Sequence, residues 1–461
     1  MATLIKNGTI VTASDTYKAD LRLENGRIAE IGAGIGKPGD ETVDAAGRYV
    51  MPGAVDAHTH LDMPFMGTYS TDDFETGTIA AAFGGTTSII DFVVPARGQP
   101  LQAAVEIWQA KAEGKAAIDF GLHCCVVEMT DKTLPEMEAL VRLGITSFKV
   151  FTAYPGVLMI DDGAIFRALR WSVRHGALVQ LHAENGPVIG EIVAELIAQQ
   201  KTDPVFHALS RPSQLEGEAT ARVIALAEVA GAPLYVVHLT CKEALDAVSA
   251  ARQRGVRVYA ETCPQYLYLS VDDLARPDFE GAKFVCSPPL RPKWHAEHLW
   301  RGLATGQLQT VATDHCPFHF KGLKEMGRGD FRKIPNGLPA IETRVLLMHQ
   351  GVVDGKLGLC RLVDAVSTAP AKLFGLYPRK GALVPGADAD VVIWDPERRV
   401  DLSNHNLHMR VDYSLYEGME VRGGPEKVYS RGQLIVAGDE FLGEAGRGRF
   451  LAREPFAPER L

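Results

Sequence analysis

The 461-residue sequence contains no apolar run that approaches the length of about 20 residues needed to cross a membrane. It also contains no block of basic residues and no low-complexity tract, and its formal net charge is -9. We therefore expect neither a membrane partner nor a nucleic-acid partner. The first residues lack a charged segment followed by an apolar segment, so no secretion signal is expected and a cytoplasmic location is predicted by default.

Cysteine is scarce, and the seven cysteines include no C-x-x-C pair. An odd number of scattered cysteines indicates buried, reduced thiols rather than a disulfide framework. A catalytic thiol could be considered at Cys316, two residues after Asp314. Nothing near it except a metal ion would lower its pKa, so we do not assign Cys316 to catalysis.

The middle of the chain alternates apolar strand segments with amphipathic helical segments. The first predicted strand ends near His60, and seven more are Thr86–Val94, Ile118–Val127, Ile145–Phe151, Leu178–His182, Leu234–His238, Val256–Glu261 and Gln309–Asp314. Apolar residues spaced by three and four predict helices at Pro135–Leu143, Gly163–Val173, Glu216–Ala230 and Lys242–Arg254. This alternation predicts an α/β fold with a closed (β/α)8 barrel. The alternative, an open doubly wound sheet, lacks a G-x-G-x-x-G motif after the first strand.

Both ends of the chain are rich in short strands. Residues 4–12 and 19–31 are predicted to form strands, and the turn dipeptide Asn25-Gly26 interrupts the second. Residues 389–394 and 427–436 show a similar strand pattern. Because chain ends often lie close together, we expect them to form one small β-sandwich. The predicted division is residues 1–50 and 371–461 for the sandwich and 51–370 for the barrel, with Phe441–Leu461 as an extended oligomerisation tail.

Histidines and an aspartate recur where the predicted strands end, and barrel active sites lie on that face. In Asp56-Ala57-His58-Thr59-His60 two histidines stand at i and i+2, which on a strand places both imidazoles on one face. His182, His238 and Asp314 follow at the ends of later strands. Each histidine alone is typical of a buried, hydrogen-bonded core residue. Four imidazoles and a carboxylate on one rim instead suit a divalent metal ion, with Zn²⁺ as the preferred candidate.

Lys149 differs from the other rim residues because it lies inside an apolar strand, Ile145–Phe151. A buried, unpaired ammonium is unfavourable, so its pKa should fall and leave a nucleophilic amine. It could form a Schiff base as in an aldolase, or react with CO₂ to form a carbamate whose negative charge lies between two cations. The nearby histidines favour the carbamate. The alternative is a purely structural role, in which Lys149 forms an ion pair with Asp91.

At these residues the chain resembles the amidohydrolase superfamily, and more closely its cyclic amidases of the dihydropyrimidinase and D-hydantoinase type. The resemblance runs from Met1 to the tail. Its motifs are Asp56-Ala57-His58-Thr59-His60, Phe148-Lys149-Val150-Phe151, His182-Ala183-Glu184-Asn185-Gly186, Val237-His238, Glu261-Thr262-Cys263-Pro264-Gln265-Tyr266, Cys286-Ser287-Pro288-Pro289-Leu290-Arg291, Thr313-Asp314-His315-Cys316-Pro317 and Ile334-Pro335-Asn336-Gly337. Together these motifs are highly specific, whereas H-x-H alone is weak.

The resemblance implies a binuclear metal centre, with one ion held by His58, His60 and Asp314. It implies that His182 and His238 hold the second ion and that carboxylated Lys149 bridges the two. It further implies roles for three other groups. Tyr154 would polarise the substrate oxygen, Asp314 would move the proton, and backbone groups of Ser287 and Asn336 would hold the cyclic amide.

The implied reaction is hydrolysis of 5,6-dihydropyrimidines or 5-substituted hydantoins to N-carbamoyl amino acids. Leu61-Asp62 stands where dihydroorotase-like relatives carry an arginine, which disfavours an anionic substrate. The apolar stretches 63–66 and 155–160 are predicted to contact the exocyclic group. The alternatives are allantoinase, a dihydroorotase-like enzyme or a non-enzymatic scaffold relative that has lost metal ligands. The resemblance also predicts a homotetramer.

Overall fold

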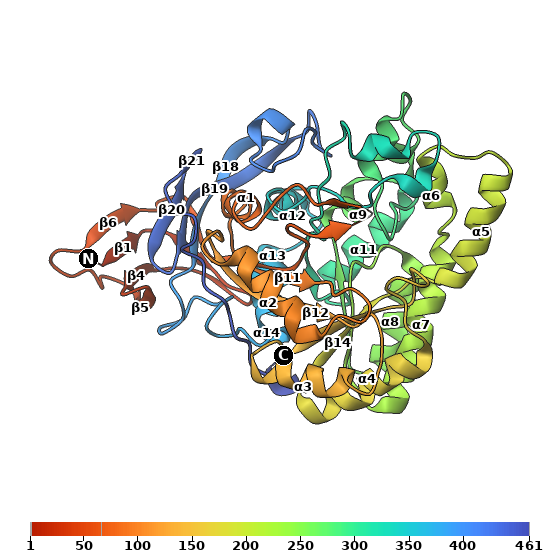
Figure 1. Ribbon diagram of the computed structural model, residues 1–461. Coiled ribbons are helices and arrows are strands. Elements are labelled where there is room, and N and C mark those ends of the chain that lie inside the picture. The colour runs from red at the N-terminus through yellow and green to blue at the C-terminus, as the bar shows by residue number, and fades with distance from the viewer. Residues whose placement is uncertain (1, 66, 461) are drawn as a thin grey trace.

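The computed structural model describes residues 2–65 and 67–460, and a sheet of eight parallel strands lies at its centre (Figure 1). Its strands follow chain order: β8 (Ala54–Thr59), β11 (Thr86–Val93), β12 (Asp119–Cys125), β13 (Ser147–Phe151), β14 (Leu178–His182), β15 (Leu234–Val236), β16 (Val258–Thr262) and β17 (Thr310–Val311). Thr59, which ends β8, forms a parallel bridge with His315, four residues after β17, and this bridge closes the barrel. The predicted (β/α)8 barrel is therefore confirmed.

The barrel strands are buried on both faces, which explains why they appear in the sequence as continuous apolar runs. Every residue of β8, β11, β12, β13 and β14 is buried. The last strand is shorter than predicted, because β17 ends at Val311 and the chain continues to Asp314 without strand pairing. That irregular segment carries a predicted metal ligand.

Helices surround the barrel (Figure 1). The four predicted helices are confirmed as α3 (Thr133–Arg142), α4 (Asp162–His175), α7 (Ser213–Ala230) and α8 (Lys242–Gln253). The others are α1 (Thr76–Phe83), α2 (Leu101–Ala112), α5 (Gly186–Ala198), α6 (Val205–Leu209), α9 (Pro264–Tyr268), α10 (Val271–Leu274), α11 (Trp294–Ala304), α12 (Arg344–Val353), α13 (Leu359–Val363) and α14 (Ala369–Leu373). Within residues 2–65 and 67–460, no helix is both long and apolar enough to cross a membrane.

Two antiparallel-rich sheets form the sandwich beside the barrel, at the left of Figure 1. The first contains β5 (Arg27–Gly32), β4 (Asp20–Glu24), β1 (Thr3–Lys6) and β6 (Glu41–Asp44). The second contains β21 (Glu440–Phe441), β20 (Gln433–Ala437), β19 (Glu420–Ser430), β18 (Val391–Asp401), β7 (Tyr49–Pro52), β2 (Thr9–Val11) and β3 (Thr16–Lys18). A hydrophobic cluster joins the sheets and includes Leu21 from the first and Val391 from the second. A sandwich built from both chain ends is thereby confirmed.

The amino-terminal strand pattern differs from the prediction at one point. Residues 4–12 do not form one strand, because the chain turns at Asn7, with φ of 63°, and enters the other sheet. A Cβ at Gly8 would lie 2.5 Å from Val50 Cγ2, so the turn packs too closely for a side chain there. The predicted hairpin turn is confirmed, since Asn25 and Gly26 both have positive φ as a type I′ turn requires.

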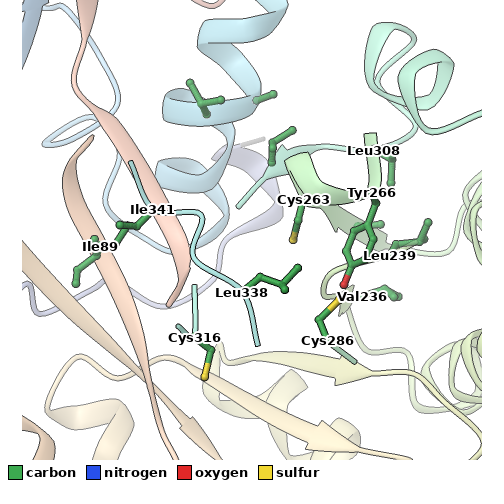
Figure 2. Packing of buried hydrophobic residues seen from close by; sticks show 14 of the residues in the cluster. Ile89, Val236, Leu239, Cys263, Tyr266, Cys286, Leu308, Cys316, Leu338 and Ile341 are labelled. Carbon is green, nitrogen blue, oxygen red and sulfur yellow. The ribbon is translucent and has the colours of Figure 1, made fainter. Parts of the chain in front are cut away.

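The cysteines are part of the hydrophobic core. Figure 2 shows Cys263, Cys286 and Cys316 among buried apolar side chains. All seven cysteines are free, and all except Cys360 are buried. Burial raises the pKa of the Cys316 thiol well above its ordinary value, so this thiol is poorly suited to act as a nucleophile.

The carboxyl-terminal tail runs along its own barrel. Phe120 N donates to Arg449 O at 3.0 Å, and Leu451 N donates to Phe120 O at 2.7 Å. Arg453 is buried, and its guanidinium donates to Ser147 Oγ at 2.8 Å. The tail is extended as predicted, and these contacts attach it to the barrel of the same chain.

Candidate metal centre and substrate pocket

All six predicted metal ligands lie at the end of the barrel where the strands finish. His58 lies in β8, His60 follows that strand, Lys149 lies in β13, His182 ends β14, and His238 and Asp314 follow β15 and β17. The five basic residues are buried, and Asp314 is half-buried. Because parallel strands present their carboxyl ends at the same edge, side chains distant in sequence converge there.

The first cluster consists of His58, His60 and Asp314. Asp314 Oδ1 lies 3.2 Å from His58 Nε2 and 3.2 Å from His60 Nε2, and the three donor atoms all lie within 4.8 Å of one another. In tetrahedral zinc sites, bonds of about 2.0–2.2 Å place the ligand atoms roughly 3.3 Å apart. Two imidazole nitrogens and one carboxylate oxygen at these separations fit a zinc-like divalent cation.

The second cluster contains His182 and His238. His182 Nδ1 lies 2.9 Å from His238 Nε2, so two imidazole nitrogens converge on the same space. The His238 ring stacks against that of His58 with centroids 5.4 Å apart, which places the two clusters side by side. Burial, together with the neighbouring His182 and Lys149, lowers the pKa of His238 well below its ordinary value. A neutral imidazole is the form that binds a metal.

Lys149 lies between the two clusters. Its Nζ is 2.9 Å from His58 Nε2 and 4.4 Å from the centre of the Phe92 ring. Burial lowers its pKa, and Asp314 only partly opposes that effect. The alternative ion pair is not formed, since Asp91 accepts hydrogen bonds from Thr59 Oγ1 and Leu61 N instead. The amine is therefore closer to neutral than an ordinary lysine.

Two carboxylates, Glu261 and Glu184, lie behind the histidines and are functional candidates for which no role was predicted from the sequence. Glu261 Oε1 lies 2.6 Å from His58 Nδ1, and Glu184 Oε2 lies 2.8 Å from His182 Nε2. Burial raises the pKa of Glu261 to about 8, while Tyr235 donates to its other oxygen at 2.8 Å. Such carboxylates orient metal-binding imidazoles. In the sequence, only their positions at or just after strand ends indicated that these two carboxylates could belong to the site.

Three site residues adopt the left-handed backbone region. The φ values are 63° for Tyr154, 37° for His238 and 53° for Asp314. Residues other than glycine in this region carry a free-energy penalty of about 1–3 kcal/mol, and such strain is concentrated at functional sites. The surrounding fold therefore holds these three residues against their local preference.

A cavity of about 800 Å³ opens over the two clusters. Tyr154, Ser287 and Asn336 line it together with His60, Lys149, His182, His238 and Asp314. Burial and the nearby Glu184 carboxylate raise the pKa of the Tyr154 hydroxyl, so it remains protonated and can donate a hydrogen bond. The cavity thus brings all three predicted substrate-contacting residues to the metal-ligand clusters.

The apolar wall of the cavity differs in detail from the prediction. Met63, Pro64, Phe65, Val157 and Leu158 line it, whereas Met159 does not. Met66, also predicted, lies outside the described residues. Asp62 is also absent from the lining, because its carboxylate faces Lys111 Nζ at 3.5 Å. Asp62 therefore does not contact a ligand in this cavity directly.

Comparison with known proteins gives a consistent result across the whole chain. The sequence profile of the amidohydrolase family matches residues 49–435. A D-hydantoinase from Streptomyces coelicolor is 52% identical over 457 residues, covering 98% of each chain. A D-phenylhydantoinase from Escherichia coli is 43% identical over 466 residues, covering 100% of each. The crystal structure of a dihydropyrimidinase from Brevibacillus agri has a TM-score of 0.98 at 50% identity, with 99% and 100% of the chains covered.

Proposed function

The chain belongs to the amidohydrolase family, and from that premise we propose that it is a cyclic amidase of the D-hydantoinase and dihydropyrimidinase type. It hydrolyses the cyclic amide bond of 5-substituted hydantoins or 5,6-dihydropyrimidines to give N-carbamoyl amino acids. The observation that carries this proposal is the cavity that places a protonated tyrosine beside two metal-ligand clusters. The retained ligands argue against a scaffold relative that has lost them.

The proposed centre holds two divalent cations, with Zn²⁺ preferred. His58, His60 and Asp314 would hold one ion, and His182 and His238 would hold the other. When bound, the two ions would supply an acidified water and a Lewis acid at neutral pH. The donor types and separations described above support this assignment.

We assign Lys149 as an N6-carboxylated bridge between the two sites. The neutral amine would form an N–C bond with CO₂, one C=O electron pair would move to oxygen, and a proton would leave the nitrogen. The resulting carbamate would place a negative charge between the two proposed ion sites. The buried position of Lys149, 2.9 Å from His58 Nε2 and without an acid partner in the described part of the chain, supports the assignment.

The reaction needs a group that moves a proton from the attacking water to the leaving ring nitrogen, and we assign this role to Asp314. Burial opposes ionisation, but His58 and His60 outweigh it and lower the pKa of Asp314 to about 2. An ionised carboxylate at this position could accept the proton of the attacking water and pass it to the leaving nitrogen as the C–N bond breaks.

Tyr154 would donate its hydroxyl hydrogen to the substrate carbonyl oxygen, whose negative charge grows during attack. Removing one such donor reduces kcat by about 10²–10³-fold in other hydrolases. Backbone groups of Ser287 and Asn336, which also line the cavity, would hold the amide and ureide edge of the ring.

The apolar cavity wall would receive the exocyclic substituent. Phe65 and Leu158 are the residues to test, because both line the cavity and Met159 does not. Phe65→Ala and Leu158→Ala should each reduce the preference in kcat/KM for a bulky 5-substituted hydantoin over unsubstituted hydantoin by about tenfold. Met159→Ala is the matched control and should leave the ratio unchanged. An unchanged ratio in both test variants would place the substituent elsewhere.

We further propose a homotetramer in the cytoplasm, with residues 51–370 as the catalytic barrel and 1–50 and 371–461 as the sandwich and tail. Truncation after Glu444 tests the tail. Loss of the tetramer in a sedimentation profile would support an oligomerisation role, and an unchanged profile would restrict the tail to its own barrel.

The proposed activity is tested by assaying ring opening of hydantoin, dihydrouracil, allantoin and dihydroorotate with metal-analysed protein. We expect turnover of the first two substrates and two equivalents of metal per chain. Preference for allantoin or dihydroorotate would reassign the enzyme within the cyclic amidases. Metal-free protein with no turnover after reconstitution with Zn²⁺ and bicarbonate would favour the scaffold alternative.

A further inference from the structure

A second buried lysine lies behind the loops that carry Ser287 and Asn336. Lys324 begins the short 3-10 helix η2 (Lys324–Gly327), and its side chain is fully buried. Its Nζ donates to three backbone carbonyls: Val285 O at 3.0 Å, Pro335 O at 3.0 Å and Gly337 O at 2.8 Å. An ammonium has three hydrogens, so these three acceptors account for all of them.

The three carbonyls belong to the two loops that line the cavity. Pro335 and Gly337 flank Asn336, and Val285 stands two residues before Ser287. Asn336 thus lies between the two residues, Pro335 and Gly337, whose carbonyls accept from Lys324. Asn336 lines the cavity and Lys324 does not, so Lys324 is placed to act on a ligand through Asn336.

The same loops are joined at two further points. Gly337 N donates to Val285 O at 3.0 Å, and Asn336 Nδ2 donates to Ser287 Oγ at 3.3 Å. A Cβ at Gly337 would lie 2.2 Å from Cys316 O, so only glycine fits this close approach. The loops are therefore closely packed at Gly337, and the Lys324 side chain joins them through its three hydrogen bonds.

We propose that Lys324 is a positioning residue for the substrate, fixing the backbone of the 285–287 loop relative to the 335–337 loop. This inference rests on the proposed function and deepens it, because those loops hold the amide and ureide edge of the ring. Lys324 touches neither the metal-ligand clusters nor the cavity. Its loss should therefore weaken substrate binding more than it slows the chemical step.

The test compares Lys324→Met, Lys324→Gln and the control Lys333→Met. Lys333 lies in the same segment, nine residues further along, but its side chain is 69% exposed. With hydantoin as the probe, Lys324→Met should raise KM about tenfold with kcat changed less than about threefold. Lys324→Gln retains donor hydrogens and should give a smaller rise in KM. Lys333→Met should match wild type, and metal content should be equal in all four proteins.

The outcomes separate this inference from the proposed function. Wild-type protein without ring-opening activity would remove the proposed function itself. Active wild type with an unchanged KM in folded Lys324→Met would overturn only the role of Lys324. An equal fall in kcat and metal content would show that Lys324 supports the metal centre instead. Failure of both Lys324 variants to fold would assign the residue to folding and would also overturn the proposal.

Discussion

Two of the buried lysines, Lys149 and Lys380, have opposite surroundings. At the barrel centre, Lys149 has its Nζ 2.9 Å from a histidine nitrogen, and no carboxylate forms an ion pair with it in the described residues. At the junction of barrel and sandwich, Lys380 Nζ lies 2.7 Å from Asp119, 3.1 Å from Asp388 and 2.7 Å from Asp390. Burial lowers the pKa of Lys149, whereas at Lys380 the three carboxylates outweigh burial and raise it.

The difference shows that burial alone does not make a lysine reactive. Lys380 remains a protonated structural cation that joins two parts of the fold. Lys149 lacks that compensation because the nearest acids are engaged elsewhere: Glu261 contacts His58, and Asp314 contacts His58 and His60. An amine in this position could react with CO₂ from the cavity, and its carbamate would place a negative charge between the two proposed ion sites.

The largest expected effect comes from removing the lysine at the barrel centre. Lys149→Ala should reduce kcat/KM for hydantoin by about a thousandfold or more, because the bridge between the two metal sites is lost. Short carboxylic acids such as propionate should restore part of the activity by occupying the vacated space. The measurement is steady-state kinetics together with metal analysis.

The exposed Lys132 provides the control for this experiment, since Lys132→Ala should retain wild-type kinetics. Near-normal turnover by Lys149→Ala without added acid would show that Lys149, like Lys380, has no direct role in the reaction.

Removing the lysine at the junction should affect stability rather than catalysis. Lys380→Met leaves three carboxylates without their cation and should lower the free energy of unfolding by about 3–5 kcal/mol. Because the folded pKa of Lys380 is raised, its contribution is present below the unfolded value of about 10.4 and is lost only as pH rises through the folded pKa. Urea unfolding should therefore give the same loss at pH 6 and pH 9.

The half-buried Lys372 offers a matched control, and Lys372→Met should change stability by less than about 0.5 kcal/mol. A fall in kcat per folded, metal-loaded Lys380→Met enzyme would contradict a purely structural role.

The smallest of these effects concerns an acid that is engaged with a histidine rather than with Lys149. Glu261→Gln keeps the shape of the side chain but replaces the carboxyl group that faces His58 Nδ1 with an amide, and should weaken metal affinity about 10–100-fold. Chelator competition measures this affinity. Glu228→Gln, at an exposed carboxylate, should have no effect. Unchanged metal affinity in Glu261→Gln would show that His58 needs no carboxylate to orient it.

Much of the fold could be predicted because the barrel repeats one pattern. Eight apolar runs with helices between them predict a closed parallel barrel, and ligands at strand ends converge by geometry alone. The terminal strands were harder to predict, because the break at Asn7 depends on close packing of Gly8 against Val50 in the neighbouring strand β7.

The supporting residues of the site could not be predicted for a similar reason. Glu261 and Lys324 act through contacts with residues distant in sequence, whereas Glu184 contacts His182 only two residues away. A buried charged residue in an apolar segment does not reveal its partner. Likewise, Leu158 lines the cavity and Met159 does not, and this difference depends on the backbone conformation of the loop, which the sequence pattern does not give. Sequence patterns along the chain locate the strand ends, whereas side-chain contacts across the barrel are known only from the three-dimensional structure.

The most direct test of the central claim is ¹³C NMR of metal-reconstituted enzyme equilibrated with ¹³C-bicarbonate. We predict one carbamate signal in wild type and in Lys380→Met, and its absence in Lys149→Ala. An active, metal-loaded wild-type enzyme without a carbamate signal, or a signal that persists in Lys149→Ala, would contradict the account.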